Sequence, residues 1–485
     1  MRVRILVVVA LLAAVAACGS TANRGTTVAL EGTHAGAATT TPSTAPTSGD
    51  GAPAAPAAPV PGGATTGATV ARGGATASPT GPVPTGPLEV GFLTTATSNA
   101  SAFGAVLPQT IPERDIINAL VAQINAAGGI RGRKVVPIFS DTDTGSTSWD
   151  ADFAAGCAAF TEDHHVEAVL GYVFGQADTL EQCLQAKRIP HLSATFGAED
   201  AATSARLPYL FNIASPMIER RSILKIDGAL DAGILTKTSK LGIVMDGCPS
   251  TTSSWKATVK PYIESKGVPI ASVFQLGCPR GAADAAAEVG RVGNLVLQMR
   301  TNGVDVMMFH AESEGPALFA IANAAEPQGY RPTYIVSSLA QTAVTAEQVP
   351  AAQRPNVHGW GWMPLNDTKR PQWPALAPAA SRCLALLKKG GIAPSTSVDY
   401  AGALFTCDAV FLFEEAMQAT GGRTDGPSIA AAIEAMGTKH ASALTLDGSS
   451  SFGPGHHDAP TTARQFDYQA GCACFVYRAG TRTIR

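Results

Sequence analysis

Short apolar runs alternate with segments of helical periodicity over most of this chain, and this alternation constrains the fold more than any other feature. The predicted strands form a first series at 88–93, 135–139, 166–170 and 190–192 and a second series at 241–245, 268–275, 304–309 and 333–336. Strands that alternate with helices of about 10–15 residues indicate βαβ units and parallel sheets. We therefore predict an α/β fold with two doubly wound parallel-sheet lobes. Ligands of such sheets bind beyond the carboxyl ends of the strands.

The first eighteen residues have the layout of a bacterial export signal. Arg2 and Arg4 precede an apolar run at 5–14, which is shorter than the ~20 residues that a membrane-spanning helix needs. The run leads into Val-Ala-Ala-Cys18, which resembles a lipobox, in which the cysteine is acylated. We expect 1–18 to be a lipoprotein signal and the mature protein to be anchored outside the cell membrane through Cys18. The alternative is a plain cleaved signal with an incidental cysteine.

Residues 19–87 consist almost entirely of Ala, Thr, Gly, Ser and Pro, and they contain no Phe, Trp or Tyr. Such a composition cannot bury enough apolar surface to offset the loss of chain entropy on folding. We expect this segment to be a disordered tether between the anchor and a folded part at 88–485.

The length and charge of the folded part limit the possible functions. About 400 residues exceed what one hydrophobic core usually supports, which again favours two domains. Without Arg2 and Arg4 the chain has 33 Lys plus Arg and 38 Asp plus Glu, a net charge of −5. Because no basic stripe is present, we expect no nucleic-acid partner. No second apolar run is long enough to cross a bilayer.

Eight cysteines remain after Cys18, and an even number in an exported chain suggests disulfides. We expect pairing in sequence order, although the connectivity stays open at this point: Cys157 with Cys183, Cys248 with Cys278, Cys383 with Cys407, and Cys472 with Cys474. The last pair needs a bend, because two residues along a strand separate the Cα atoms by ~6.6 Å, near the ~6.8 Å limit for a disulfide. No C-x-x-C pair suggests a metal site.

The folded part resembles the type I periplasmic binding proteins of the leucine/isoleucine/valine-binding class. The most specific match is Ile-Asn-Ala-Ala-Gly-Gly-Ile-Arg-Gly-Arg at 124–133, and shorter matches lie at 88–93, 169–171, 189–194 and 302–306. The resemblance implies one lobe from 88–213 and 341–438 and a second from 214–340 and 439–485. The chain would cross near 212–216, 337–341 and 437–446, and the lobes would close around a small ligand by hinge motion.

The same resemblance implies a function. Lipoprotein members of the class deliver their ligand to a membrane ABC permease, so we expect an extracytoplasmic, monomeric solute-binding protein of an ABC importer. We expect no catalysis, cofactor or metal. Two alternatives stay open: a sensor module of the same fold, and a cell-envelope enzyme on an α/β scaffold.

Three loops of the first lobe follow predicted strands, and in the amino-acid binders the corresponding loops hold the ligand carboxylate through backbone N–H groups and hydroxyls. The candidate residues are Thr94, Thr95 and Ser98; Tyr172, Phe174, Gly175 and Gln176; and Ser193, Ala194 and Thr195. Ser193 and Thr195 fit this role best. The alternative is that these hydroxyls cap helices or close turns.

The second lobe departs from the amino-acid binders. Asp246 follows a strand but lacks the tyrosine that the class places nearby, and Ser337 stands where an acidic residue usually holds the ligand ammonium. His310 and Glu312, with Glu314, are candidates for the missing charge, or else solvated loop residues. Trp360 and its neighbour Trp362 are candidates for the cleft wall or for the core. These departures favour a larger or less charged ligand than a simple amino acid.

No catalytic motif stands out in the sequence. G-x-S-x-G, H-E-x-x-H, Walker A and G-x-G-x-x-G patterns are all absent. His456-His457-Asp458 follows a Gly/Pro-rich run, and adjacent residues on a strand point to opposite faces, so we interpret it as a turn rather than a metal site.

Overall fold

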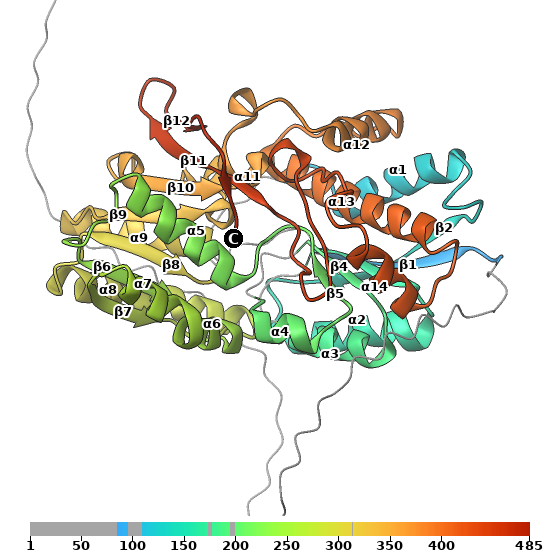
Figure 1. Ribbon diagram of the computed structural model, residues 1–485, viewed down its shortest axis with the longest axis horizontal. Coiled ribbons are helices and arrows are strands. Elements are labelled where there is room, and N and C mark those ends of the chain that lie inside the picture. The colour runs from blue at the N-terminus through green and yellow to red at the C-terminus, as the bar shows by residue number, and fades with distance from the viewer. Residues whose placement is uncertain (1–84, 96–108, 173–176, 195–198, 313) are drawn as a thin grey trace, which may run out of the picture. The chain divides into compact units, whose positions relative to one another are not determined.

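The computed structural model describes residues 85–95, 109–172, 177–194, 199–312 and 314–485 (Figure 1). The expected signal, Cys18 and residues 19–84 of the expected tether lie outside these residues, as do the candidate ligand residues Ser98, Phe174, Gly175, Gln176 and Thr195. Within the described residues no helix is both long and apolar enough to cross a membrane.

The first sheet contains five parallel strands in the order β2-β1-β3-β4-β5. Its strands are β1 (Leu88–Thr95), β2 (Val135–Thr142), β3 (Ala168–Gly171), β4 (His191–Ser193) and β5 (Leu210–Asn212). The helices of this part are α1 (Glu113–Ala126), α2 (Trp149–Ala158), α3 (Asp178–Lys187), α4 (Ala201–Arg206), α12 (Pro378–Lys389), α13 (Ser397–Ala419) and α14 (Gly426–Glu434), and a π-helical turn (Ala159–Asp163) extends α2.

Both faces of the first sheet are covered by helices (Figure 1). Phe92 packs into a core with residues of α1 and α13, whereas its neighbour Leu93 packs into a separate core with residues of α2 and α3. Successive strand residues point to opposite faces, so one short apolar run supplies both cores. This explains why β1 has adjacent apolar residues at Phe92 and Leu93 instead of a strict alternation of apolar and polar residues.

The second sheet has eight strands in the order β12-β11-β10-β9-β8-β6-β7, with β13 paired to β11. Its strands are β6 (Leu241–Met245), β7 (Ile270–Gln275), β8 (Val306–His310), β9 (Thr333–Ser337), β10 (Val357–Gly361), β11 (Thr462–Gln469), β12 (Cys474–Tyr477) and β13 (Arg482–Thr483). Strands β6 to β10 are parallel, and the last three strands are antiparallel additions at one edge.

Helices also cover both faces of the second sheet. They are α5 (Ile218–Asp231), α6 (Pro249–Ser254), α7 (Lys260–Ser265), α8 (Ala282–Thr301) and α9 (Glu314–Ala325), followed by the short α10 (Thr342–Thr345) and α11 (Pro364–Asp367); a π-helical segment (Trp255–Val259) joins α6 to α7. Ile243 packs on the α5 and α7 side, and its neighbour Val244 packs against α8 and α9. The predicted α/β fold with two doubly wound sheets is therefore confirmed.

One boundary differs from the expected division of the chain. The segment 341–438 was expected to lie wholly in the first lobe, with a crossing near 337–341. Instead β10 pairs in parallel with β9, so the chain stays in the second sheet until Gly361. It then crosses and enters α12 and α13, which pack against α1.

Three segments that connect the two sheets are joined to one another by hydrogen bonds. Trp362 Nε1 donates to the backbone oxygen of Ala214 at 2.7 Å, and Leu446 N donates to the backbone oxygen of Trp362 at 2.8 Å. Asn212 also pairs with the segment at Asp458. These contacts tie the connections together where the chain passes from one sheet to the other.

The expected disulfide pairs are all present. They are Cys157–Cys183, Cys248–Cys278, Cys383–Cys407 and Cys472–Cys474. The bend that the last pair requires occurs at Ala473, whose φ of 49° lies in the left-handed region and brings the two Cα atoms to 5.1 Å. This turn joins β11 to β12 at the sheet edge.

Candidate ligand-binding pocket

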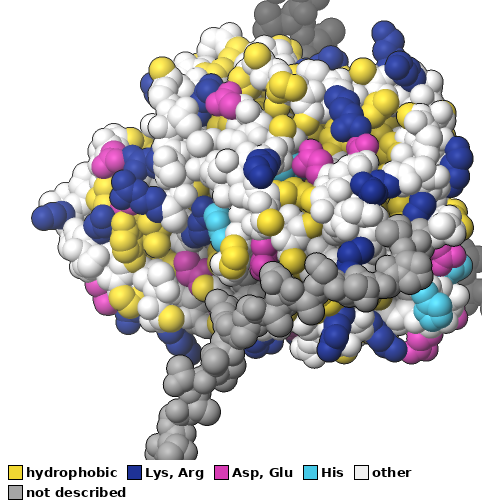
Figure 2. Space-filling model, turned by 45° about the vertical axis from the view of Figure 1, so that its right-hand side comes forward, with side chains coloured by type: hydrophobic (Ala, Val, Ile, Leu, Met, Phe, Trp, Pro, Cys, Tyr) yellow, Lys and Arg dark blue, Asp and Glu magenta, His cyan; other side chains and the backbone are white. Residues whose placement is uncertain are grey.

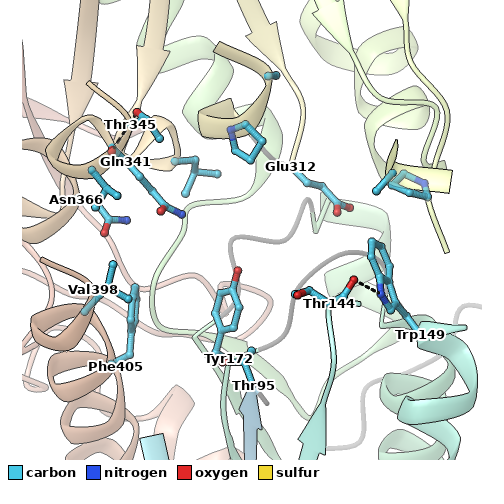
Figure 3. Close-up of a pocket in the computed structure, with 18 of the residues that line it drawn as sticks. Thr95, Thr144, Trp149, Tyr172, Glu312, Gln341, Thr345, Asn366, Val398 and Phe405 are labelled. Carbon is cyan, nitrogen blue, oxygen red and sulfur yellow. Dashed lines mark hydrogen bonds between the residues drawn. The ribbon is translucent and has the colours of Figure 1, made fainter. Parts of the chain in front are cut away.

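A cavity of about 280 Å³ opens at the carboxyl ends of strands from both sheets (Figure 3). Thr95, at the end of β1, and Tyr172, just after β3, line it from the first sheet. Asp246 follows β6 and Glu312 follows β8 in the second sheet. The cavity therefore lies where doubly wound sheets bind their ligands.

Much of the cavity wall is apolar. It includes Leu93, Ile117, Leu170, Val292, Val344 and Phe405, which come from elements of both parts of the chain. Figure 3 shows Val398 and Phe405 of α13 on one side, and Trp149, at the start of α2, on the other. Trp149 Nε1 donates to the backbone oxygen of Thr144 at 3.4 Å, which holds the indole beside the loop after β2. A predominantly apolar wall with a few polar groups is typical of small-molecule sites.

Glu113 of α1 holds the end of β1 in place. Its carboxylate accepts hydrogen bonds from Thr95 N at 2.8 Å and from Thr95 Oγ1 at 3.0 Å. Burial raises the pKa of the Glu113 carboxyl, and the two bonds from Thr95 oppose this rise. The acid at the first position of α1 also faces the positive end of the helix dipole.

Tyr172 projects into the cavity from the end of β3 (Figure 3). Burial is the main cause that raises the pKa of its phenol, and the charges of Glu113 and Glu312 add to the rise. The hydroxyl therefore stays protonated over the physiological range, and a protonated phenol can both donate and accept a hydrogen bond.

Asp246 joins two loops of the second sheet. Its carboxylate accepts from Cys248 N at 3.1 Å and from Glu312 N at 2.9 Å. Burial raises the pKa of Asp246, against the effect of these bonds. The Cys248–Cys278 disulfide then connects the same loop to the segment after β7. The acidic side of the cavity is thus fixed by hydrogen bonds and by a covalent cross-link.

An amide group lies on the side of the cavity away from Trp149. Gln341 has a φ of 49°, an uncommon conformation for a residue other than glycine. Thr345, at the end of α10, caps this turn by donating to the backbone oxygen of Ala340 at 2.7 Å. Asn366 lies beside it and donates to the backbone oxygen of Ser338 at 3.3 Å. Figure 3 shows the side chain of Gln341 directed into the cavity.

Four of the predicted ligand residues line this cavity: Thr95, Tyr172, Asp246 and Glu312. The other described candidates from the first sheet do not. Thr94 is buried and donates to Asp141, and Ser193 and Ala194 are fully buried at and just after the end of β4. Contact of Thr94, Ser193 and Ala194 with a ligand stays a prediction.

The remaining candidates of the second sheet face the protein interior. His310 bonds to Ser222 at 2.9 Å and to Ser254 at 3.1 Å, and burial lowers its pKa to about 3, which keeps the ring neutral. Ser337 donates to Glu314 at 2.9 Å. Trp360 is buried in the core against α5. None of these three residues is among the described residues of the cavity wall.

Sequence reasoning missed several residues of the wall. Glu113, Trp149 and Phe405 lie on helices, where their patterns indicate packing and nothing more. Of these missed residues, Gln341 is the one whose position could have indicated a ligand contact, because it is a polar residue shortly after the predicted strand at 333–336.

The described residues contain no cluster of three or more His, Cys, Asp or Glu side chains that could hold a metal ion. The run His456-His457-Asp458 instead forms part of a turn, in which Gly453 N donates to His456 O at 2.9 Å. On the visible face in Figure 2, Lys and Arg side chains are scattered among other residues and form no stripe.

Comparison with known proteins identifies the family. A family model described as periplasmic binding protein matches residues 87–472. The chain belongs to this family. A Leu/Ile/Val-binding protein homolog 8 from Brucella abortus (strain 2308) is 27% identical over 225 residues, which are 44% of this chain and 50% of that protein. The chain thus spans about half the length of the curated relatives that it matches.

Solved structures of solute-binding proteins of ABC transporters share the fold. A solute binding protein of an ABC transporter from Rhodopseudomonas palustris HaA2, in complex with p-hydroxybenzoic acid, has a TM-score of 0.60 at 14% identity, covering 82% of this chain and 98% of that one. A fatty acid ABC transporter substrate-binding protein from Thermomonospora curvata has a TM-score of 0.56 at 15% identity, covering 83% and 94%. At these identities the likeness shows the fold alone.

Proposed function

We propose that this periplasmic binding protein is an extracytoplasmic, lipid-anchored solute-binding protein that captures a small ligand and delivers it to an ABC importer. The observation that carries the proposal is the cavity lined by strand ends of both sheets, because it gives each half of the protein a share of the ligand contacts. Both solved proteins described above are binding components of ABC transporters, which supports the proposal.

The connections between the sheets suit a hinge. Hinge closure needs a few segment ends that absorb changes in backbone angle while the packed halves move as rigid bodies. The connections at Ala214, Trp362 and Leu446 are held together by hydrogen bonds and lie between two separately covered sheets. In our proposal, closure brings Tyr172 and Glu312 onto the same ligand from opposite sides.

The proposed anchor follows from the sequence. An acylated Cys18 and a tether of about 70 residues would hold the binding domain near the permease without fixing its orientation. A single acyl chain gives only marginal membrane binding, whereas the several chains of a lipoprotein anchor hold the protein firmly.

Ligand capture is tested by filling the cavity. Ala317 of α9 lines the cavity, and its replacement by Trp in A317W should occupy the space that a ligand needs. The matched control F319W changes the same helix at a residue outside the described cavity wall. We would screen amino acids, amides, amines, aromatic acids and fatty acids by thermal shift, because a ligand that binds only the folded state raises the melting temperature.

The expected result is a solute that stabilises the wild type and F319W but not A317W. Stabilisation of all three proteins by the same solute would contradict capture in this cavity. The anchor is tested separately in cells: Cys18→Ser should abolish incorporation of labelled palmitate and release the protein from the membrane fraction, and unchanged labelling would contradict the proposed lipidation.

A further inference from the structure

The charged side chains of the cavity wall all have the same sign. Glu113, Asp246, Glu288 and Glu312 line the cavity, whereas the described part of the wall contains no Lys or Arg. The sequences of the undescribed segments 96–108, 173–176 and 195–198 also contain no Lys or Arg. A ligand carboxylate would therefore find no cationic side chain in the wall.

The acidic groups of the wall do not supply protons that could replace cationic side chains as partners of a ligand carboxylate. Both oxygens of Glu113 accept hydrogen bonds from Thr95, and both oxygens of Asp246 accept backbone N–H groups. Hydrogen bonds accepted by both oxygens favour the ionised form of a carboxyl group, and the ionised form has no proton to donate to an anionic ligand. Glu288 is paired with Arg291 at 2.8 Å on the surface of α8.

Helix N-termini would be the other source of positive potential for an anion. The longer helices that begin beside the cavity already carry the protein's own acids, whereas the short α6 and α10, of six and four residues, have none in their first turns. Glu113 opens α1, Glu314 opens α9, and Asp150 and Asp284 lie in the first turns of α2 and α8. Asp399 forms a capping box with Thr396 at the start of α13, and it accepts from Thr396 N at 3.1 Å.

One arginine lies near the acidic side of the cavity but outside its wall. Arg221 is fully buried and donates to the backbone oxygen of Ala311 at 2.8 Å and to Ser215 Oγ at 3.2 Å. Glu312 and Glu314 are among the acids whose charges raise its pKa, against the lowering by burial. Arg221 thus donates to groups of the protein interior, and it is not among the described residues of the cavity wall.

The other end of the cavity has an uncharged polar group. Among the described residues, the side-chain amide of Gln341 has no hydrogen-bond partner, and it points into the cavity (Figure 3). Figure 3 shows Gln341 on one side of the cavity and Trp149 on the other, with Glu312 nearer to Trp149 than to Gln341. Apolar side chains from both parts of the chain also line the cavity.

We infer that the ligand of this cavity is a mainly apolar amine without a carboxylate, whose ammonium group lies toward Glu312 and whose apolar body lies against Leu170, Val292 and Phe405. The inference rests on the proposed function as a solute-binding protein. Carboxylates and an aromatic ring are the groups that stabilise a desolvated ammonium. A carboxylate in the same place would lose its hydration without gaining a partner of opposite charge.

The test uses one apolar body with three head groups. The cavity holds about nine water volumes at ~30 Å³ each, which suits a molecule with about ten heavy atoms. Isothermal titration calorimetry at pH 7 would compare 3-phenylpropylamine, 3-phenylpropanamide and 3-phenylpropanoate. We expect the amine to bind most tightly and the carboxylate to bind at least tenfold more weakly than the amine.

Two variants then test whether the charge of Glu312 makes the cavity prefer the amine. Glu312→Gln should weaken the amine tenfold or more and change the affinity of the amide by less than threefold. Glu347→Gln is the matched control, because Glu347 is a surface residue with a 70% exposed side chain. It should leave all three affinities unchanged. The wild-type comparison needs no variant, so a folding defect of Glu312→Gln would not remove the test.

Two results would overturn the inference: a carboxylate that binds as tightly as the amine, or a folded wild type that binds none of the three compounds. Either result leaves the proposed function intact if the wider solute screen finds a ligand that A317W rejects. The proposed function fails only if that screen finds no such ligand.

Discussion

Asp367 makes the stability of this protein depend on pH in a way that can be calculated. The residue ends α11, where the chain leaves the second sheet, and its side chain is fully buried. Its carboxyl group accepts from Ser338 Oγ at 3.1 Å and from the Tyr477 hydroxyl. Burial is the main cause that raises the pKa of Asp367 from 3.8 to about 8.

The sign of the effect follows from the protons bound. Between about pH 4 and pH 8 the folded protein keeps a neutral Asp367, whereas the unfolded chain carries the ionised form. The folded state binds one more proton, so the free energy of unfolding falls as the pH rises, by about 1.4 kcal/mol per pH unit from this group. The contribution is complete below about pH 4 and is lost by about pH 8.

Asp367→Asn removes the ionisation and keeps an oxygen that accepts from Ser338 and Tyr477. From pH 5 to pH 7 the unfolding free energy of the wild type should therefore fall by about 3 kcal/mol relative to that of D367N. Urea unfolding followed by tryptophan fluorescence at pH 5, 6 and 7 measures both free energies. D231N, which removes a carboxyl with a 68% exposed side chain, is the control. A wild type–D367N difference that does not vary with pH would refute the reasoning.

Two further predictions concern packing and redox stability. A Cβ atom added at Gly228 would lie 2.3 Å from the Trp360 ring. Gly228→Ala should therefore lower the free energy of unfolding by about 1–3 kcal/mol. An unchanged midpoint of urea unfolding would contradict this packing. With limiting dithiothreitol, Cys472–Cys474 should be the first disulfide to open, because Cys472 is exposed. Mass spectrometry of alkylated peptides checks this, and earlier alkylation of the buried Cys383 would contradict it.

The strands that sequence reasoning found contain adjacent apolar residues. β1 and β6 have such residues because helices cover both faces of each sheet, and the resulting apolar run is visible without a structure. Sequence reasoning did not predict β10, because its sequence, Val-His-Gly-Trp-Gly, contains no run of apolar residues. Gly359 leaves room for the ring of Phe466, and Gly361 leaves room for the carboxylate of Asp367, so the packing is supplied by distant residues.

The candidate site was predictable to the extent that it follows strand ends. Thr95, Tyr172 and Glu312 were found because the carboxyl ends of parallel strands meet at one edge of each sheet. His310 also ends a strand, but its side chain points into the protein, and only packing reveals this direction. Phe405 lies more than 200 residues from the first strands, and no local pattern connects it to them.

The most direct test of the account is a crystal structure of the protein soaked with 3-phenylpropylamine. The account predicts the compound in the cavity between the two sheets, with its amino group within hydrogen-bonding distance of Glu312 and its ring against Phe405. A compound that is bound elsewhere, or an amino group that points to Gln341 and away from Glu312, would contradict it.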